Sequence, residues 1–491
     1  MLDRISAVRS YGASRLGIER TTAGSRRSGL QRAATALFAR PSAWIAIAIV
    51  PVGALLSWIR LPTLTRDTLW AEDIRNFLGD AVRYGPVQAL FRSYAGYLHT
   101  VPRTIAGLTV EFAPVSTWAN SMTLGACVVT GIVGGLVFIA TGTTVRWVPA
   151  RLLIASVTFL VPLAPREVLG NAANLHWYFL WLAPWLLLYR PASRAAAWVM
   201  AAAALFATLT EIQMALFLPL MLWQRRNRLR LPIRALYLFG IALQLVATLT
   251  TPRGIPSTQS VGLASVAYGY LINCVMTILS TNPAVLGPIL ISSGPLIGIV
   301  MFLLVLAIVT YIVLRGTHLH RVLALTLLFA SLALYAIAVE VSPRTFYDYA
   351  TMPKIQLGSP WLSRYGVVPS MFLLCLIPLA CVVWRDRHPW GNSSISRSTK
   401  IGAVSARRQA VAVFRGNLAP AIPLVVVVAV MLMSFTPAYT LRSHGPDWQS
   451  QFARQQALCA HEAVASPVEL RGAPSARWQL SLPCAELGTG Q

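Results

Sequence analysis

Long apolar runs separated by short polar turns dominate the chain from residue 42 to residue 437. The runs are continuous and do not alternate between apolar and polar positions, which favours helices over the strands of a membrane barrel. A hydrocarbon layer about 30 Å thick needs about 20 apolar residues per helix. The pattern therefore predicts an all-α, polytopic transmembrane helix bundle with about 11 spans.

The predicted spans cover residues 42–59, 118–142, 152–165, 174–189, 195–210, 212–223, 235–250, 294–314, 322–341, 365–384 and 418–437. The fifth and sixth are short, so they form either one bent unit or a re-entrant pair. The apolar stretch from Val261 to Ser280 is interrupted by polar residues and is either interfacial or a further span.

Three segments flank or interrupt these spans. Residues 1–41 are rich in Arg and lack an apolar stretch, so they predict a disordered cytoplasmic tail and not a cleavable signal. The transmembrane domain, 42–437, contains a long first outer loop at 60–117, whose amphipathic pattern breaks at Gly85-Pro86 and predicts two short helices on the membrane surface. Residues 438–491 form a short extracytoplasmic C-terminal segment.

The basic residues set the orientation. The Arg clusters around residues 146–151, 190–194, 225–234, 315–321 and 385–415 and the N-terminal tail all fall on one side of the predicted bundle. Basic loops mark the cytoplasmic side, so the N-terminus is predicted to be cytoplasmic and the C-terminus extracytoplasmic, in the plasma (inner) membrane. Of the 16 acidic residues, 13 fall on the outer side.

Composition agrees with a membrane protein. Hydrophobic residues make up 56% of the chain and charged residues 12%, which a water-soluble chain of this length does not carry. The net charge of +25 is dispersed between apolar runs, so nucleic acid is not an expected partner, whereas the lipid bilayer is. Cys459 and Cys484 lie in the outer segment, where a disulfide between them is as expected as two free thiols, and the other four cysteines are expected in the core.

Two adjacent carboxylates follow the first span in Trp70-Ala71-Glu72-Asp73. A carboxylate just outside the membrane can deprotonate a hydroxyl or bind a metal ion, so Glu72 and Asp73 are candidate catalytic residues. A solvated pair in the first turn of a helix is an equally good interpretation. The same loop ends with His99 and Arg103, which we interpret as substrate-binding, with membrane anchoring as the alternative.

The turn between the third and fourth spans carries Arg166, Glu167, Asn171, Asn174 and His176. A helix beginning at Asn171 would place Asn171, Asn174 and Tyr178 on one face, with groups that suit sugar hydroxyls. Glu167 needs a partner, and Arg103 could face it more easily than the adjacent Arg166. His176 is either a structural or a catalytic histidine.

Further charged residues interrupt apolar stretches on the outer side. Glu211 lies within an apolar stretch, where an ionisable group is costly and is a functional candidate by default, unless it marks a loop tip. The 342–364 loop and the start of the next span add Arg344, Arg364 and Tyr365. One of these cations could neutralise a phosphate, and anchoring at the interface is an equally good interpretation of each residue. Motifs for nucleotide binding and zinc hydrolysis are absent from the sequence.

These residues and this organisation resemble the GT-C superfamily of membrane glycosyltransferases, in particular its actinobacterial-type members. The likeness covers most of residues 42–437. It implies a polyprenyl-phosphate sugar donor, an envelope glycan or glycolipid acceptor, and transfer on the outer face. A carboxylate of the first outer loop would serve as base or metal-binding group, with Asp73 favoured over Glu72, and Arg103, Arg344 or Arg364 would stabilise the leaving phosphate.

Because the C-terminal segment is small, transfer of a single sugar is expected. No metal ligands are assigned and no cofactor is expected with certainty, although a divalent cation fits the implied role of the acidic pair. The alternatives are a transporter or flippase of a lipid-linked or anionic envelope precursor, and a non-enzymatic envelope assembly protein. A transporter predicts polar residues at the bilayer midplane and two matched halves, and the sequence offers neither.

Overall fold

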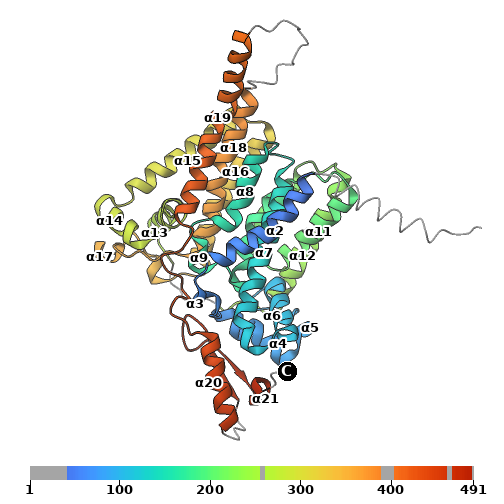
Figure 1. The fold of residues 1–491 in the computed structure, drawn as a ribbon, viewed down its shortest axis with the longest axis vertical. Helices are drawn as coiled ribbons and strands as arrows, with labels where there is room; N and C mark the ends of the chain where they lie inside the picture. Colours follow the sequence, from blue (N-terminus) through green and yellow to red (C-terminus); the bar gives the residue numbers. More distant parts are fainter. Residues whose placement is uncertain (1–40, 255–259, 389–402, 462–466, 489–491) are drawn as a thin grey trace, which may run out of the picture. The chain divides into compact units, whose positions relative to one another are not determined.

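The computed structural model describes residues 41–254, 260–388, 403–461 and 467–488. The chain divides into two compact units, residues 1–44 and 45–491, and the candidate site lies within the second. Helices account for nearly all the regular structure of the described residues (Figure 1).

Seven helical segments of the described chain are long and apolar enough to cross a membrane. Their regular parts are α2 (Pro41–Ile59), α7 (Trp118–Thr141), α8 (Val148–Leu160), α12 (Leu231–Thr250), α15 (Leu296–Arg315), α16 (His318–Val341) and α18 (Val367–Arg387). Shorter or less regular apolar helices lie among them, namely α10 (Leu175–Leu188), α11 (Arg194–Thr208), the 3₁₀ helix η4 (Ile212–Leu222), α13 (Leu263–Tyr270), α14 (Pro283–Ser293) and α19 (Ala403–Met433).

The connections contain short helices of their own. These are α3 (Thr63–Arg66), η2 (Val115–Thr117), α9 (Ala164–Glu167), η3 (Ala172–Asn174), η5 (Arg228–Arg230), η6 (Leu271–Val275), η7 (Met276–Ile278), η8 (Thr345–Tyr347), α17 (Lys354–Leu357) and η9 (Arg364–Gly366).

The prediction of an all-α helix bundle is confirmed, and each predicted apolar span coincides with a helix. The span predicted at 212–223 is a 3₁₀ helix, and the one at 418–437 is the end of the longer helix α19. The stretch 261–280 is also helical, because α13 continues through a π-helical turn to Ile278.

Helices α10 and α18 form the centre of the bundle. In the apolar stretch that contains α18, 89% of the residues are buried, whereas in that of α15 only 17% are buried. Helix α15 instead exposes Leu296, Leu303, Leu304 and Leu314, a face that suits lipid. Every residue of α10 except His176 is buried.

The Arg-rich turns meet at one end of the bundle. Arg387 donates its Nε–H to the carbonyl of Arg315 (2.8 Å), and Arg385 lies over the ring of Trp147. Trp223 stacks on His318 in the same region. Turns that are far apart in the sequence therefore share one end, as the positions of the Arg residues predict.

Residues 60–117, predicted to form the first outer loop, are mostly helical. They contain the π-helical turn η1 (Asp73–Leu78), α4 (Gly79–Tyr84), α5 (Pro86–Ala89) and α6 (Thr100–Phe112). The predicted break at Gly85-Pro86 is present, and Gly85 has φ of +82°, which glycine adopts without strain. The sequence analysis did not anticipate α6.

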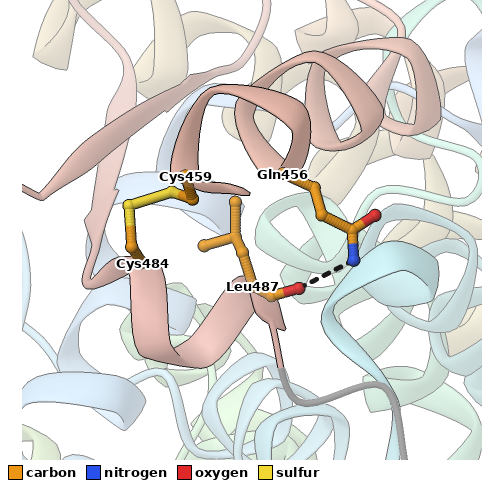
Figure 2. The surroundings of a disulfide bond; sticks show 4 residues. All are labelled: Gln456, Cys459, Cys484 and Leu487. Carbon is orange, nitrogen blue, oxygen red and sulfur yellow. Dashed lines mark hydrogen bonds between the residues drawn. A yellow bond between two sulfur atoms is a disulfide. The ribbon is translucent and has the colours of Figure 1, made fainter. Parts of the chain in front are cut away.

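The C-terminal segment folds against this loop. It contains α20 (Trp448–His461), an antiparallel pair of strands, β1 (Val468–Arg471) and β2 (Gln479–Leu482), and α21 (Cys484–Gly488). A disulfide joins Cys459 of α20 to Cys484 of α21, beside a hydrogen bond from Gln456 to the carbonyl of Leu487 (Figure 2). The other four cysteines are buried and free, as expected for core residues.

Candidate functional site

A cavity of about 360 Å³ opens among helix ends at the end of the bundle away from the Arg-rich turns. Its walls come from η1, the starts of α10 and η4, the ends of α12 and α16, η9 and the loop 94–99. The lining includes seven residues predicted from the sequence, namely Glu72, His99, Asn174, His176, Glu211, Arg364 and Tyr365. The size is at the lower end of the roughly 300–1,000 Å³ typical of small-molecule sites.

Of the two adjacent carboxylates, Glu72 lines the cavity and Asp73 does not. Asp73 is only 2% exposed, and its two oxygens accept hydrogen bonds from the backbone N–H groups of Ala172 (3.2 Å) and Ala173 (2.7 Å). Burial raises the pKa of Asp73 to about 7, opposed by the nearby guanidinium of Arg442 and these two N–H groups. Glu72 and Asp73 differ in this way because neighbouring residues of a helical turn point in different directions. Asp73 therefore lies behind the cavity wall and supports it through these two hydrogen bonds.

His176 and Glu211 form a hydrogen-bonded pair at the cavity wall. His176 Nδ1 lies 2.5 Å from Glu211 Oε2, and the other carboxylate oxygen accepts the backbone N–H of Gln213 at 2.7 Å. Glu211 is almost fully buried, whereas the imidazole is partly exposed to the cavity. Glu211 also caps the N-terminus of η4, so one carboxylate orients both a histidine and a helix.

Glu167 forms an ion pair with Arg364. The expected pairing with Arg103 is wrong, because Arg103 instead donates to Asp80 at 2.8 Å within the first outer loop. Arg364 lines the cavity, and Glu167 supports it from the buried side. This arrangement fixes the position of a guanidinium that still faces the cavity.

The helix expected to begin at Asn171 begins at Leu175, so that expectation is wrong. Asn171 is extended, and Asn171 and Asn174 both donate to the carbonyl of Glu167, at 3.1 and 3.3 Å. The two amides thus provide hydrogen bonds to a carbonyl at the end of α9 that no regular helix satisfies. Asn174 still lines the cavity, while Tyr178 is fully buried and does not.

Three of the predicted cationic residues lie away from the cavity lining. Arg103 pairs with Asp80, as described above. Arg166 donates to the carbonyl of Leu362 (2.8 Å) and lies over the ring of Tyr439, so it ties two outer loops together. Arg344 is exposed at the start of η8.

A tight turn at residues 94–97 brings aromatic rings to the cavity. Tyr94 and Tyr97 exchange backbone hydrogen bonds, and Ala95 and Gly96 between them have φ of +51° and +87°. Gly96 is required here, because its backbone conformation favours glycine and an added Cβ would lie 3.1 Å from the backbone of Arg253. Hydrogen bonds from Thr248 and Gln244 of α12 hold the turn in place.

Sequence analysis missed Arg253 as a cavity residue. Arg253 follows α12 and donates to the hydroxyl of Ser342 at the end of α16 (2.9 Å). The sequence offered one indication of its role. Arg253 is a single Arg after an apolar span, on the side of the bundle that carries few clusters of Arg. Tyr94, Tyr97, Gln213 and Thr248 also line the cavity and were not proposed as binding residues.

Four charged groups act on Tyr97. Its pKa is raised well above the ordinary value by burial first and then by the carboxylates of Glu211 and Glu72, while the guanidinium groups of Arg364 and Arg253 lower it. The four charges come from segments far apart in the sequence. All four charged residues line the cavity, as Tyr97 does.

His99 is a buried histidine at the cavity wall. It is 4% exposed, packs against Tyr97 with the two rings tilted and their centroids 4.0 Å apart, and donates its Nε2–H to the carbonyl of Tyr94 (3.1 Å). Burial lowers the pKa of His99 to about 3, and nearby His176 acts in the same direction. His99 is therefore neutral at physiological pH and a weak base.

Within the described ranges, no three His, Cys, Asp or Glu side chains are grouped so that they could hold a metal ion. No family model, curated protein or solved structure matches this chain. The fold and site together define a helical bundle, with helices suited to a membrane, that carries a charged cavity at one end.

Proposed function

We propose that this chain is a membrane glycosyltransferase of the GT-C kind that moves a single sugar from a polyprenyl-phosphate donor to an envelope glycan or glycolipid acceptor. The observation that supports this most is the grouping of Glu72, Glu211, Arg253 and Arg364 around one cavity at a single end of the bundle. Two cations suit a phosphate, and carboxylates with an imidazole suit sugar hydroxyls and proton transfer.

The cavity also has an apolar side. Ile337, Ala338 and Val341 of α16 line it next to the two cations. A lipid-linked sugar phosphate has an apolar tail, an anionic link and a polar head, and this lining offers a matching surface for each. The small volume favours a single sugar head group, with the long lipid chain remaining among the outer faces of the helices.

Orientation follows from the positive-inside rule. The end where Arg315, Arg385 and Arg387 meet would lie at the cytoplasmic surface, and the cavity would then face the outer leaflet. Nucleotide sugars remain in the cytoplasm, so a donor used on the outer side must be carried by a lipid.

The proposed reaction is an inverting displacement. An acceptor hydroxyl oxygen attacks the anomeric carbon, the bond from that carbon to the phosphate oxygen breaks, and its electron pair leaves with the prenyl phosphate. Arg364, held by Glu167, and Arg253 stabilise the leaving phosphate. The hydroxyl proton passes to a base on the cavity wall, which Glu72 and His176 both reach.

A transporter or flippase would require charged groups along a path through the membrane. The charged residues that line this cavity lie at helix ends or in loops of the same end of the bundle. This distribution favours a reaction at one surface over passage across the bilayer.

The test uses the full chain in nanodiscs with a panel of labelled polyprenyl-phosphate hexoses and pentoses and an envelope lipid extract as acceptor. We expect transfer of label from one donor class, and Arg364→Gln should reduce kcat/KM by about 10²-fold or more, as for loss of a charged group that stabilises the transition state. Arg344→Gln is the matched control, since Arg344 is exposed and lies outside the cavity lining.

Absence of transfer and of prenyl-phosphate release from every donor, in protein that is folded and embedded, would overturn the proposal. Equal loss of activity in Arg364→Gln and Arg344→Gln would show that the transfer does not take place in the cavity described here.

A further inference from the structure

We infer that His176, oriented by Glu211, is the group that takes the proton from the acceptor hydroxyl. This inference rests on the proposed glycosyl transfer and assigns a role within it that the acidic pair of the first outer loop was expected to fill. It is carried by the position, burial and hydrogen bonding of the His176–Glu211 pair.

Position is the first argument. His176 is the one residue of α10 that is not buried, and it is partly exposed because it faces the cavity. The rest of the helix packs into the centre of the bundle, so the backbone at His176 is held firmly. A base must be within hydrogen-bond reach of the proton that it removes, and a rigid helix start provides such a fixed position.

Hydrogen bonding is the second argument. Glu211 accepts from His176 Nδ1 at 2.5 Å, which places the proton on Nδ1 and leaves Nε2 as the acceptor in the neutral ring. In the described part of the chain, Nε2 of His176 makes no hydrogen bond to a protein group. A buried carboxylate that fixes the tautomer and stabilises the resulting imidazolium is the arrangement that activates histidine bases in hydrolases.

Comparison with the other candidates is the third argument. Glu72 also lines the cavity, but His176 is held in place by a buried carboxylate, which makes it the better-positioned base. His99 also lines the cavity, but burial lowers its pKa to about 3, which removes most of its basicity. Asp73 is turned away, with both oxygens bound to backbone N–H groups.

His176 Nε2 accepts the proton of the acceptor hydroxyl while the oxygen forms its bond to the anomeric carbon. The prenyl phosphate leaves with the electron pair of the broken bond. Glu211 remains ionised and pairs with the imidazolium until the proton is lost to solvent. Glu72 is then free to hydrogen-bond sugar hydroxyls.

The experiment compares His176→Gln, His176→Ala and Glu211→Gln with His99→Gln and Glu72→Gln, in full-length protein in nanodiscs with the donor that wild type uses. We expect His176→Gln to lower kcat by about 10²- to 10⁴-fold, the usual contribution of a general base, with a small change in the KM for donor. Added imidazole should restore part of the activity of His176→Ala and none of that of Glu72→Gln.

Glu211→Gln supplies the readout that a purely structural pair would not change. Loss of the carboxylate leaves the tautomer of His176 unfixed and the imidazolium without its partner. We therefore expect kcat to fall with little change in the KM for donor, whereas loss of a purely structural contact would change both. Thermal unfolding and donor binding by native mass spectrometry identify any variant that does not fold.

Wild-type turnover together with unchanged kcat in folded His176→Gln would overturn the inference and leave the glycosyl transfer intact. A fall in kcat of about 10²-fold or more in Glu72→Gln alone would assign the base to Glu72 and also overturn it. Absence of turnover in wild type with every donor would remove the proposed function and, with it, this role for His176.

Discussion

Asp73 and Arg442 are two buried charged side chains behind the cavity wall. The guanidinium of Arg442 donates to the carbonyls of Thr68 (3.3 Å) and Leu169 (3.1 Å), and it opposes the raised pKa of Asp73. Burial lowers the pKa of Arg442 to about 10. The first outer loop and the turn before α10 are thus joined by a pair of charged groups that the sequence shows as unrelated.

The raised pKa of Asp73 predicts a pH dependence of stability. Its folded value of about 7 exceeds the ordinary value of 3.8, so the folded state binds this proton more tightly than the unfolded state. The contribution is present at low pH and is lost as the pH rises toward 7. At about 1.4 kcal/mol per pKa unit, the change from pH 5 to pH 8 amounts to roughly 2 to 3 kcal/mol.

Asp73→Asn removes this titration. Between pH 5 and pH 8, the melting temperature of the variant should therefore improve relative to that of wild type, whichever of the two is more stable at pH 5. Thermal unfolding in nanodiscs at four pH values measures the difference. A constant difference across this range would contradict the raised pKa, and Asp348→Asn, whose carboxyl has a lowered pKa, is the control.

Much of the site could be predicted from residue type alone, because charged and amide groups are rare in apolar stretches. Glu72, His176, Glu211 and Arg364 were identified in this way and all line the cavity. Their pairings could not be predicted, because Glu167 with Arg364 and His176 with Glu211 join residues 197 and 35 positions apart. Arg253 was missed because a single Arg beside a span also fits simple anchoring.

At the scale of elements, the C-terminal segment is part of the wall that carries Glu72. Trp448 donates its backbone N–H to the carbonyl of Asp67 and its indole N–H to the carbonyl of Val115, at 2.8 and 2.7 Å. Ala473 donates to the carbonyl of Leu69 at 2.9 Å, three residues before Glu72. The C-terminal segment therefore fixes the residues that lead into η1.

The disulfide Cys459–Cys484 should stabilise this segment. Its two cysteines are 25 residues apart, and closing a loop of that size contributes about 3 kcal/mol in the chain-entropy model. In a Cys459→Ser, Cys484→Ser variant, we expect faster amide hydrogen exchange in α20, in the two strands and in η1, together with a lower kcat. Hydrogen exchange followed by mass spectrometry makes the comparison.

Reductant provides the control for this prediction. It should increase exchange in wild type to the level of the double variant, and it should change the variant little. Unchanged exchange in η1 would show that the C-terminal segment does not support the wall that carries Glu72.

The apolar helices were easier to predict than α6 and the C-terminal fold. Apolar runs long enough to span a bilayer give helices whatever their detailed sequence, because backbone groups in lipid must be hydrogen-bonded within the segment. The helix α6 was not anticipated, because Arg103 and Thr109 interrupt the buried face that Ile105 and Ala106 contribute to. The C-terminal fold also depends on contacts with residues 67–75, which no local pattern encodes.

At the scale of the whole molecule, the two ends of the bundle differ in chemistry. One end gathers Arg-rich turns, and the other carries the cavity with acids and cations together. Charge of one sign at one surface sets the direction of insertion, and a mixed cavity at the other surface suits a substrate that is itself part lipid and part anion. The orientation of the bundle therefore decides on which side of the membrane the proposed transfer takes place.

Single-cysteine labelling tests this orientation. Arg344 and Arg226 are both exposed, and they lie at the cavity end and the Arg-rich end respectively. In intact cells, a membrane-impermeant maleimide should label Arg344→Cys and should label Arg226→Cys only after permeabilisation. The four natural free cysteines are buried, so wild type should give little background. The reverse pattern would place the cavity at the cytoplasmic surface, where a nucleotide-linked donor is accessible and a lipid-linked donor is no longer required.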